Sequence, residues 1–319
     1  MVKSILFSFA ALILLCALTA GGWLYRCASY LDNTMVLGEY SIEKGESFYS
    51  FYNKVFLEHN PPFALKSYLI MKGYDKKVHF GEYIADNITI GELLSNIITG
   101  KQNLLKLTIP EGYNMYDIAA ALEAAGISSR SEMLSTFKDR KVVEKLSGVS
   151  YESLEGFLAP GTYFFAKNLS SEQIAKTLVE EFFRTLPENF EPLVKRNGLS
   201  FYDALIIASI VQKETYIESE APFVAAVFIN RMKKRMRMQA DPTIIYGKYE
   251  SYDGTISKRD LQDRENRFNT YTHNGLPPTP ISNPSVIALT AVANPTKTDF
   301  IYFVAKQDGT HVFSKSYAE

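Results

Sequence analysis

The N-terminal apolar run most constrains what this chain can fold into, because residues 4–25 include no charged side chain. A helix of this length rises about 33 Å, which is enough to cross the hydrocarbon core of a bilayer. Apolar character continues past the small residues at 17–20 to Trp23 and Tyr25, which favours an uncleaved transmembrane helix over a cleaved signal peptide. Lys3 favours a cytoplasmic N-terminus, so we expect the rest of the chain to lie outside the cytoplasm.

The composition of this 319-residue chain argues against several kinds of site. Lys and Arg total 34 and Asp and Glu total 35, so no overall field attracts nucleic acid. The two cysteines, Cys16 and Cys27, are too few for a disulfide framework. The four histidines are scattered without pairs at helical spacing, so zinc chemistry is not expected. We therefore expect no metal and no nucleic-acid partner.

We expect residues 1–29 to form the cytoplasmic start and the anchor, and residues 30–104 to form a small α+β module beside the membrane. The pattern in this module predicts one strand and three helices: 80–84, 48–56, 63–71 and 89–98. A strand, a glycine turn and a helix also occur twice, beginning at Ile42 and at Ile109. This order resembles small LysM-type carbohydrate-binding modules, and a structural spacer that holds the rest of the chain off the membrane explains it equally well.

Residues 105–319 are long enough for a second, larger α+β domain. Four helices are predicted there: 118–125, 171–186, 201–218 and 224–232. Strand-like segments at 301–305 and 311–314 predict a terminal hairpin, and Pro160 with Gly161 predicts a hairpin-like loop. The proline-stiffened loop at 269–284 is expected to bury little and to wall a binding cleft.

Glu214 stands out in the third of these helices because it extends an apolar stripe. At helical spacing it shares one face with Ile207, Ile210 and Val211. Apolar neighbours disfavour the charged form of a carboxyl, so its pKa should rise toward neutrality, as a general acid needs. Alternatively, Glu214 ends the buried stripe and turns toward solvent or an arginine. The local pattern alone leaves both interpretations open.

Two polar features follow this helix in the sequence. A basic cluster, either a solvated helix end or a surface that meets acidic groups on a polymer, comprises Arg231, Lys233, Lys234, Arg235 and Arg237. Farther on, Asp241 directly precedes Pro242, which is typical of a helix start whose N-cap is the aspartate. A cap alone is enough to explain an aspartate at this position.

Six short motifs in a fixed order resemble the YceG-like endolytic murein transglycosylases, also called the MltG family. They lie at 154–156, 208–215, 227–231, 238–243, 269–271 and 275–278. The resemblance covers nearly the whole chain and is strongest from Glu155 to Phe313. Gln212 stands where family members often have a first glutamate, so the catalytic acid that the resemblance implies is Glu214.

The resemblance implies cleavage of the bond between N-acetylmuramic acid (MurNAc) and N-acetylglucosamine (GlcNAc) in nascent peptidoglycan strands, which would terminate strand elongation. In this lytic chemistry Glu214 protonates the leaving oxygen, and its carboxylate then takes a proton from the muramoyl C6 hydroxyl to give a 1,6-anhydro end. No metal or cofactor is implied. Gln239, Asp241, Asn269 and Tyr271 are the candidates for holding sugar groups and positioning the acid. A helix cap for Asp241 and a packed wall for Tyr271 remain structural alternatives.

The implied partners are peptidoglycan glycan strands, the membrane and peptidoglycan synthases. The implied location is the cytoplasmic membrane, crossed once, with the catalytic domain outside the cytoplasm, which is the periplasm if the cell is Gram-negative. Two other functions stay open. One is a hydrolase in which Glu218 supplies a second carboxylate, although acids four residues apart on one helix normally face the same side. The other is a noncatalytic peptidoglycan-binding scaffold of the synthesis machinery.

Overall fold

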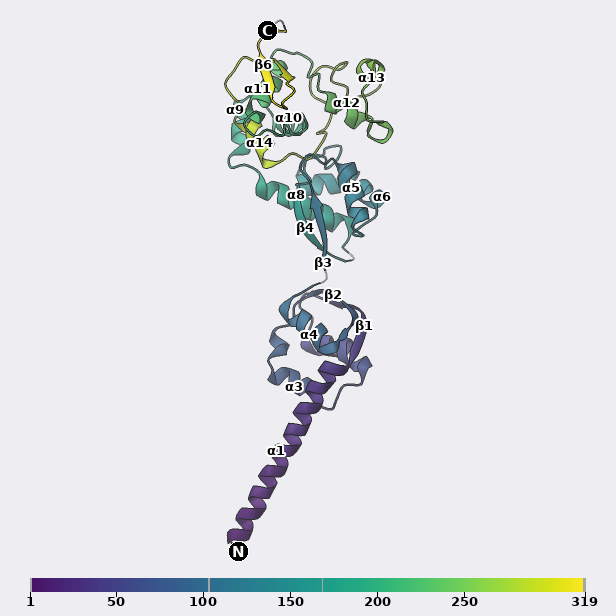
Figure 1. Ribbon diagram of the computed structural model, residues 1–319, viewed down its shortest axis with the longest axis vertical. Helices are drawn as coiled ribbons and strands as arrows, with labels where there is room; N and C mark the ends of the chain where they lie inside the picture. Colours follow the sequence, from purple (N-terminus) through teal and green to yellow (C-terminus); the bar gives the residue numbers. More distant parts are fainter. Residues whose placement is uncertain (1, 103, 168, 318–319) are drawn as a thin grey trace. The chain divides into compact units, whose positions relative to one another are not determined.

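The computed structural model describes residues 2–102, 104–167 and 169–317 and divides the chain into two compact units. The first unit is Met1–Leu105 and the second is Lys106–Glu319 (Figure 1). Each combines helices with small two-stranded sheets and has its own hydrophobic core. The α+β class predicted from the sequence is therefore confirmed.

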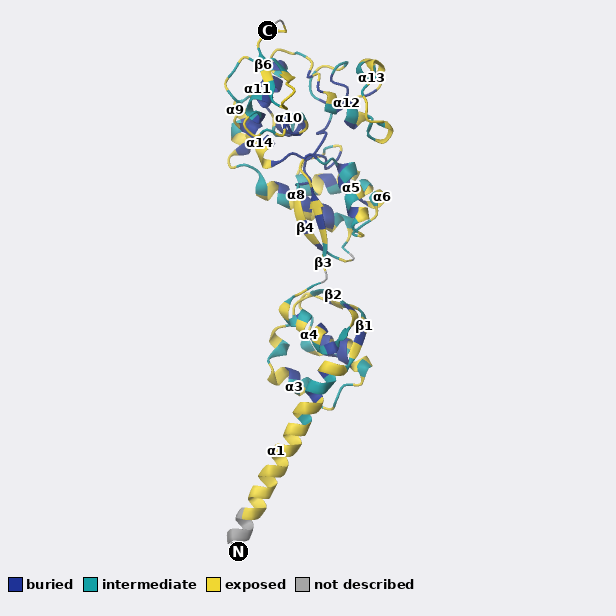
Figure 2. Cartoon of the chain, in the orientation of Figure 1, coloured by how far each residue is buried: buried dark blue, intermediate teal, exposed yellow. Residues whose placement is uncertain are grey.

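The chain begins with the long helix α1, Val2–Asn33. Its stretch Phe7–Asn33 is long and apolar enough to cross a membrane, and Figure 2 shows most of α1 exposed. The end of α1 differs, because Cys27 is fully buried and Leu31 is 8% exposed within the core of the first unit. The helix therefore runs beyond the predicted Tyr25, and the expected division between residues 29 and 30 falls inside it.

The rest of the first unit is a two-stranded sheet with three α-helices. Strand β1 (Met35–Ile42) pairs antiparallel with β2 (Gly81–Thr89). The helices, joined by short 3-10 turns, are α2 (Phe48–Phe56), α3 (Leu65–Met71) and α4 (Ile90–Thr99). Side chains of Ser47 and Thr89 cap α2 and α4, and Gly100 ends α4 in the left-handed conformation. The predicted helix at 48–56 is thus confirmed, and the helix predicted at 89–98 ends at its expected glycine.

The second unit contains two further sheets and a larger set of helices. Strand β3 (Leu104–Ile109) pairs with β4 (Gly161–Ala166), and β5 (Tyr302–Ala305) forms the predicted terminal hairpin with β6 (His311–Ser314). The α-helices are α5 (Met115–Ala124), α6 (Arg130–Lys138), α7 (Arg140–Ser147), α8 (Ser171–Thr185), α9 (Phe190–Arg196), α10 (Phe201–Glu214), α11 (Ala221–Lys233), α12 (Asp241–Gly247), α13 (Lys258–Gln262) and α14 (Val286–Ala293).

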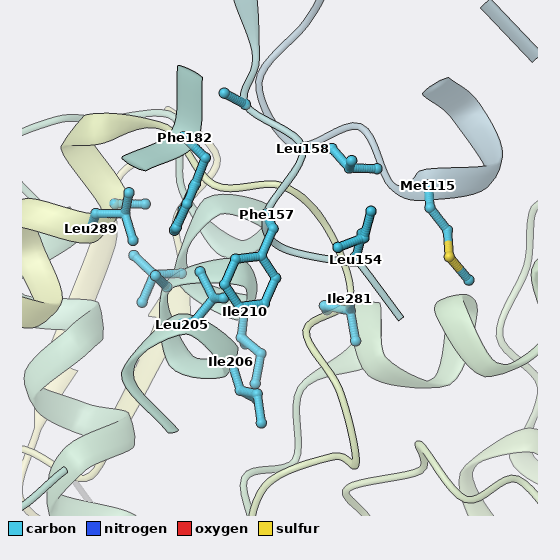
Figure 3. Close-up of a cluster of buried hydrophobic side chains, with 14 of the residues drawn as sticks. Met115, Leu154, Phe157, Leu158, Phe182, Leu205, Ile206, Ile210, Ile281 and Leu289 are labelled. Atoms are coloured by element: carbon cyan, nitrogen blue, oxygen red, sulfur yellow. The ribbon is translucent and has the colours of Figure 1, made fainter. Parts of the chain in front are cut away.

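The core of the second unit gathers around α10, which packs against α11 and α14. Figure 3 shows Leu205 and Ile210 of α10 among Phe157, Phe182 and Leu289. The loop that carries Phe157 is buried, and the strand after it pairs with β3. The prediction of a hairpin-like loop at Pro160 is therefore wrong. Phe157 packs in the core, and β4, the strand after the loop, pairs with β3 rather than with a strand just before Pro160.

The proline-stiffened loop at 269–284 also buries more than expected. Its Ile281 N–H donates to the Ser209 hydroxyl at 3.0 Å, and the Ser282 hydroxyl donates to the Ser209 carbonyl at 3.0 Å. Ser209 lies in the middle of α10, and both Ser282 and Asn283 are fully buried. The loop therefore forms a strap along α10, because its polar groups find partners there that replace water.

The end of α10 determines how the acidic residues are presented. The helix stops at Glu214, four residues before the predicted end, because Thr215 adopts extended backbone angles of φ −144° and ψ 141°. Glu218 consequently lies in the connection to α11 and is exposed. The two acids are not on one helix, so the helical argument against their flanking a bond does not apply.

Candidate active site

Glu214 is the last residue of α10 and lies at the edge of the hydrophobic core. Ile207 and Ile210 on its face are fully buried, whereas Glu214 keeps partial access to solvent. Its carboxyl makes no hydrogen bond or ion pair with any residue that the structure describes. Burial and, to a smaller extent, the nearby Asp241 charge raise the pKa of Glu214 to about 7, against the opposing charge of Arg231. A large fraction of this carboxyl thus carries its proton near neutral pH, with no protein acceptor competing for it.

Asp241 contributes the negative charge that faces this acid. It is the exposed first residue of α12, and its Oδ1 accepts a hydrogen bond of 2.6 Å from the Tyr271 hydroxyl. The expected N-cap role is wrong, since Ala240 occupies the cap and no side chain caps the helix. Burial and the Asp241 carboxylate both raise the pKa of Tyr271, so Tyr271 remains a neutral hydrogen-bond donor.

Arg231 is the cation whose charge acts on Glu214. Its guanidinium is buried, with Nε donating to the Ile301 carbonyl at 2.7 Å and a terminal nitrogen donating to the Met238 carbonyl at 2.6 Å. The solvated-helix-end interpretation is wrong for this residue, because Arg231 continues the buried stripe of Val224 and Phe228 on α11. The same reasoning that picked out Glu214 would have identified it. Its charge holds down the pKa of Glu214.

Asn269 and Gln239, the other two predicted site residues, have different surroundings. The Asn269 side chain is fully buried; its Nδ2 donates to the carbonyls of Asp260 and Asp263, and its Oδ1 accepts from the Tyr271 N–H at 3.0 Å. Gln239 is exposed and has a left-handed backbone with φ +48°. The structure therefore brings Glu214, Asp241 and Tyr271 together, joins Asn269 to the backbone of Tyr271, and leaves Gln239 exposed.

A cavity of about 310 Å³ lies next to this cluster and was not identified from the sequence. It is lined by Asn114, Asp117, Lys213, Pro242, Ile245, Tyr246, Tyr249, Tyr252 and Ile281. The Tyr249 ring stacks on Tyr116 with centroids 4.7 Å apart, and its hydroxyl donates to Asp117 at 2.7 Å. Two of the lining residues, Lys213 and Pro242, are the sequence neighbours of Glu214 and Asp241, and three tyrosines form much of the rest of the wall.

Glu155 is a second glutamate held away from water, and sequence reasoning gave it no chemical role. It is fully buried; Oε2 accepts from the Met115 N–H at 2.9 Å and the Tyr246 hydroxyl at 2.8 Å, and Oε1 accepts from the Asn283 amide at 3.0 Å. Burial raises the pKa of Glu155 to about 8, and these hydrogen bonds limit the rise. Its contacts join the start of α5, the end of α12 and the loop before α14.

The residues that the structure describes include no group of three histidine, cysteine or acidic side chains that could hold a metal ion. The groups that the structure brings together are a carboxyl with a raised pKa, a neutral phenol, a second carboxyl and a buried guanidinium.

The model of the YceG-like family matches residues 32–319, which is nearly all of the chain. The chain belongs to this family. A crystal structure of a YceG-like protein from Listeria monocytogenes aligns with a TM-score of 0.59 and 26% identity, covering 89% of this chain and 98% of that one. The family resemblance seen in the sequence is thus confirmed.

Two curated relatives carry the name endolytic murein transglycosylase. The one from Bacillus subtilis (strain 168) is 31% identical over 228 residues, covering 67% of this chain and 62% of the relative. The one from Streptococcus pneumoniae serotype 2 (strain D39 / NCTC 7466) is 28% identical over 228 residues, covering 63% of this chain and 40% of the relative. The chain thus spans less than two thirds of the length of the relatives that it matches.

Proposed function

We propose that this chain is a membrane-anchored lytic transglycosylase that cleaves MurNAc–GlcNAc bonds within nascent peptidoglycan strands. Membership of the YceG-like family and relatives named endolytic murein transglycosylase support this function. The observation that carries it is Glu214, a partly exposed carboxyl with a pKa raised to about 7 and no partner among the described residues. Such a group is suited to give and take one proton near neutral pH.

One carboxyl suffices for the proposed reaction. Protonated Glu214 donates to the glycosidic oxygen as the bond from that oxygen to C1 of the muramoyl sugar breaks. The resulting carboxylate then removes the proton of the C6 hydroxyl while O6 bonds to C1, which gives a 1,6-anhydro end and regenerates the acid. No water is consumed. A hydrolase would instead need a second carboxylate across the bond to activate water.

The neighbouring residues have separate roles in this proposal. The Asp241 charge keeps the proton on Glu214, and Tyr271 holds Asp241 in place through the 2.6 Å hydrogen bond. Asn269 acts indirectly by fixing the loop of Tyr271, whereas the exposed Gln239 contacts sugar hydroxyl or acetamido groups. The tyrosine-lined cavity beside Lys213 accommodates a sugar ring next to the scissile bond, since aromatic faces pack well against sugar C–H groups.

The anchor places this activity where strands are made. Helix α1 spans the cytoplasmic membrane once, with both units on the outer side, and the enzyme trims strands as membrane-bound synthases extend them. Equal cell function from a soluble form released into the periplasm would count against this arrangement. The first unit serves either as a glycan-binding module of LysM type or as a support for the catalytic unit.

The test is mass spectrometry of products from uncrosslinked glycan strands digested by the full chain in detergent micelles. The proposal expects new strand ends that carry 1,6-anhydroMurNAc. Reducing ends would show hydrolysis and reject the lytic reaction. Absence of cleavage together with retained strand binding would favour the noncatalytic scaffold.

A further inference from the structure

The way α1 enters the first unit limits how far that unit can lie from a bilayer. Residues 7–22 of α1 are all exposed, and Trp23 is the first residue of the helix that packs against the unit. The uncharged run from residue 4 to residue 22 has a helical length of about 29 Å, almost the thickness of a hydrocarbon core. Because this helical length barely matches the hydrocarbon thickness, the surface of the first unit around Trp23 lies at the level of the lipid headgroups.

Trp23 is joined at this level to the loop that precedes α3. Its indole N–H donates to the Phe63 carbonyl at 3.2 Å, and its ring meets Tyr68 of α3 edge-on with centroids 6.2 Å apart. The Phe63 side chain itself is 94% exposed. Pro61 and Pro62 stiffen the loop, so Phe63 is presented outward on a rigid support.

The exposed face of α3 continues this apolar surface. Leu65 and Leu69 point into the core, whereas Ile70 and Met71, about two turns beyond Phe63, are 46% and 60% exposed. Residues 57–77 also hold four lysines against two acids, which favours an anionic surface. The combination of outward apolar side chains and nearby lysines is typical of segments that lie in a membrane interface.

We propose that Phe63, Ile70 and Met71 form a second membrane contact, a lipid-facing surface that seats the first unit directly on the outer leaflet. This inference rests on the proposed transmembrane role of α1. Phe63 inserts beside Trp23 among the acyl chains just below the lipid headgroups. The nearby lysines lie close to the lipid phosphates. The first unit then fixes its own orientation at the bilayer, because α1 and the loop at Phe63 provide two separate points of contact.

The single tryptophan of the chain makes this placement measurable. The full chain is inserted into phosphatidylcholine and phosphatidylglycerol vesicles whose acyl chains carry bromine at known depths, and tryptophan quenching is recorded. Three proteins are compared: the parent, Trp23→Phe with Phe63→Trp, and Trp23→Phe with Phe80→Trp. Phe80 is a matched control because it is 56% exposed in the same unit and its carbonyl binds Gln102, where the chain leaves that unit.

The proposal expects bromine near the headgroups to quench the tryptophan at position 63 about as strongly as Trp23, and to leave the tryptophan at position 80 unquenched. If Trp23 is quenched but position 63 is open to aqueous iodide, the lipid-facing surface is rejected while the anchor stands. Quenching at both 63 and 80 would also reject it, since the contact would not be specific to this face. An unquenched Trp23 in the parent would reject the anchor itself. Circular dichroism melting of each variant in vesicles confirms that the unit remains folded.

Discussion

Glu155 and Glu214 are both glutamates of the second unit whose pKa is raised by burial, yet their surroundings differ. Glu155 is fully buried and accepts three hydrogen bonds from distant parts of the unit. Glu214 ends a helix, keeps some exposure and has no partner among the described residues. A raised pKa alone therefore does not identify a catalytic acid; the absence of competing partners and access for a ligand are also needed.

The largest expected effect is the loss of cleavage in Glu214→Gln. The amide keeps the shape of the side chain but has no transferable proton, so kcat/KM should fall by about 10³-fold or more. Because the fold raises the pKa of Glu214 to about 7, the carboxyl disfavours folding near neutral pH, and the neutral amide should raise the free energy of unfolding at pH 7 by roughly 1–3 kcal/mol. Strand cleavage and denaturant unfolding measure the two quantities. The exposed Glu218→Gln is the matched control, and equal losses in both variants would contradict the assignment.

Glu155→Ala should lower the free energy of unfolding while largely keeping the activity. It removes the acceptor of the Met115 N–H, of the Tyr246 hydroxyl and of one of the two N–H groups of the Asn283 amide, the other of which donates to the Tyr113 carbonyl. This loss should lower the free energy of unfolding by about 2–4 kcal/mol. Activity per folded molecule should stay within about tenfold of the parent, since no step of the reaction uses this residue. Denaturant unfolding with Glu152→Ala as control checks this, because the interaction that the structure describes for Glu152 is an exposed ion pair with Arg267. A Glu155→Ala variant that is stable but inactive would contradict a structural role for Glu155.

Asp241→Asn should change the pH dependence of kcat/KM for strand cleavage. The Asp241 charge raises the pKa of Glu214, so its removal lowers that pKa and the protonated acid is lost at a lower pH. The alkaline limb of kcat/KM should therefore move down by about half to one pH unit. Asp308→Asn, an exposed substitution in the terminal hairpin turn, should leave the limb in place. A shift to higher pH would show that Asp241 does not act on Glu214 through its charge.

Tyr271→Phe should have the smallest effect of the four. It removes one hydrogen bond to an exposed carboxylate and keeps the ring, so kcat/KM should fall by about three- to tenfold. Steady-state cleavage assays separate the effect on kcat from that on KM, and the exposed Tyr317→Phe serves as control. A loss as large as that of Glu214→Gln would mean that the phenol itself transfers a proton.

Several elements could be predicted because their signals are local. The helix predicted at 171–186 is observed as α8, and the stripe of Ile207, Ile210 and Val211 led to Glu214. The terminal hairpin followed from two short strand-like segments and the turn between them. In each case the deciding contacts lie within a few residues of one another.

What could not be predicted depends on contacts between distant segments. The sequence around Asp241 is typical of an N-cap, but its carboxylate instead accepts a hydrogen bond from Tyr271, thirty residues later. Glu155 finds Asn283 across 128 positions, which no pattern near either residue reveals. Helix α1 was recognised from its hydropathy, whereas the burial of Cys27 required knowledge of the unit that folds around it.

The central claim is that Glu214 holds its proton near neutral pH while remaining free to donate it. Carbon-13 NMR of the side-chain carboxyls in protein labelled with [δ-¹³C]glutamate tests this directly, with Glu214→Gln used to assign the resonance. The account predicts a Glu214 signal that titrates with a pKa of about 7. A Glu214 carboxyl that is already ionised at pH 5 would contradict it.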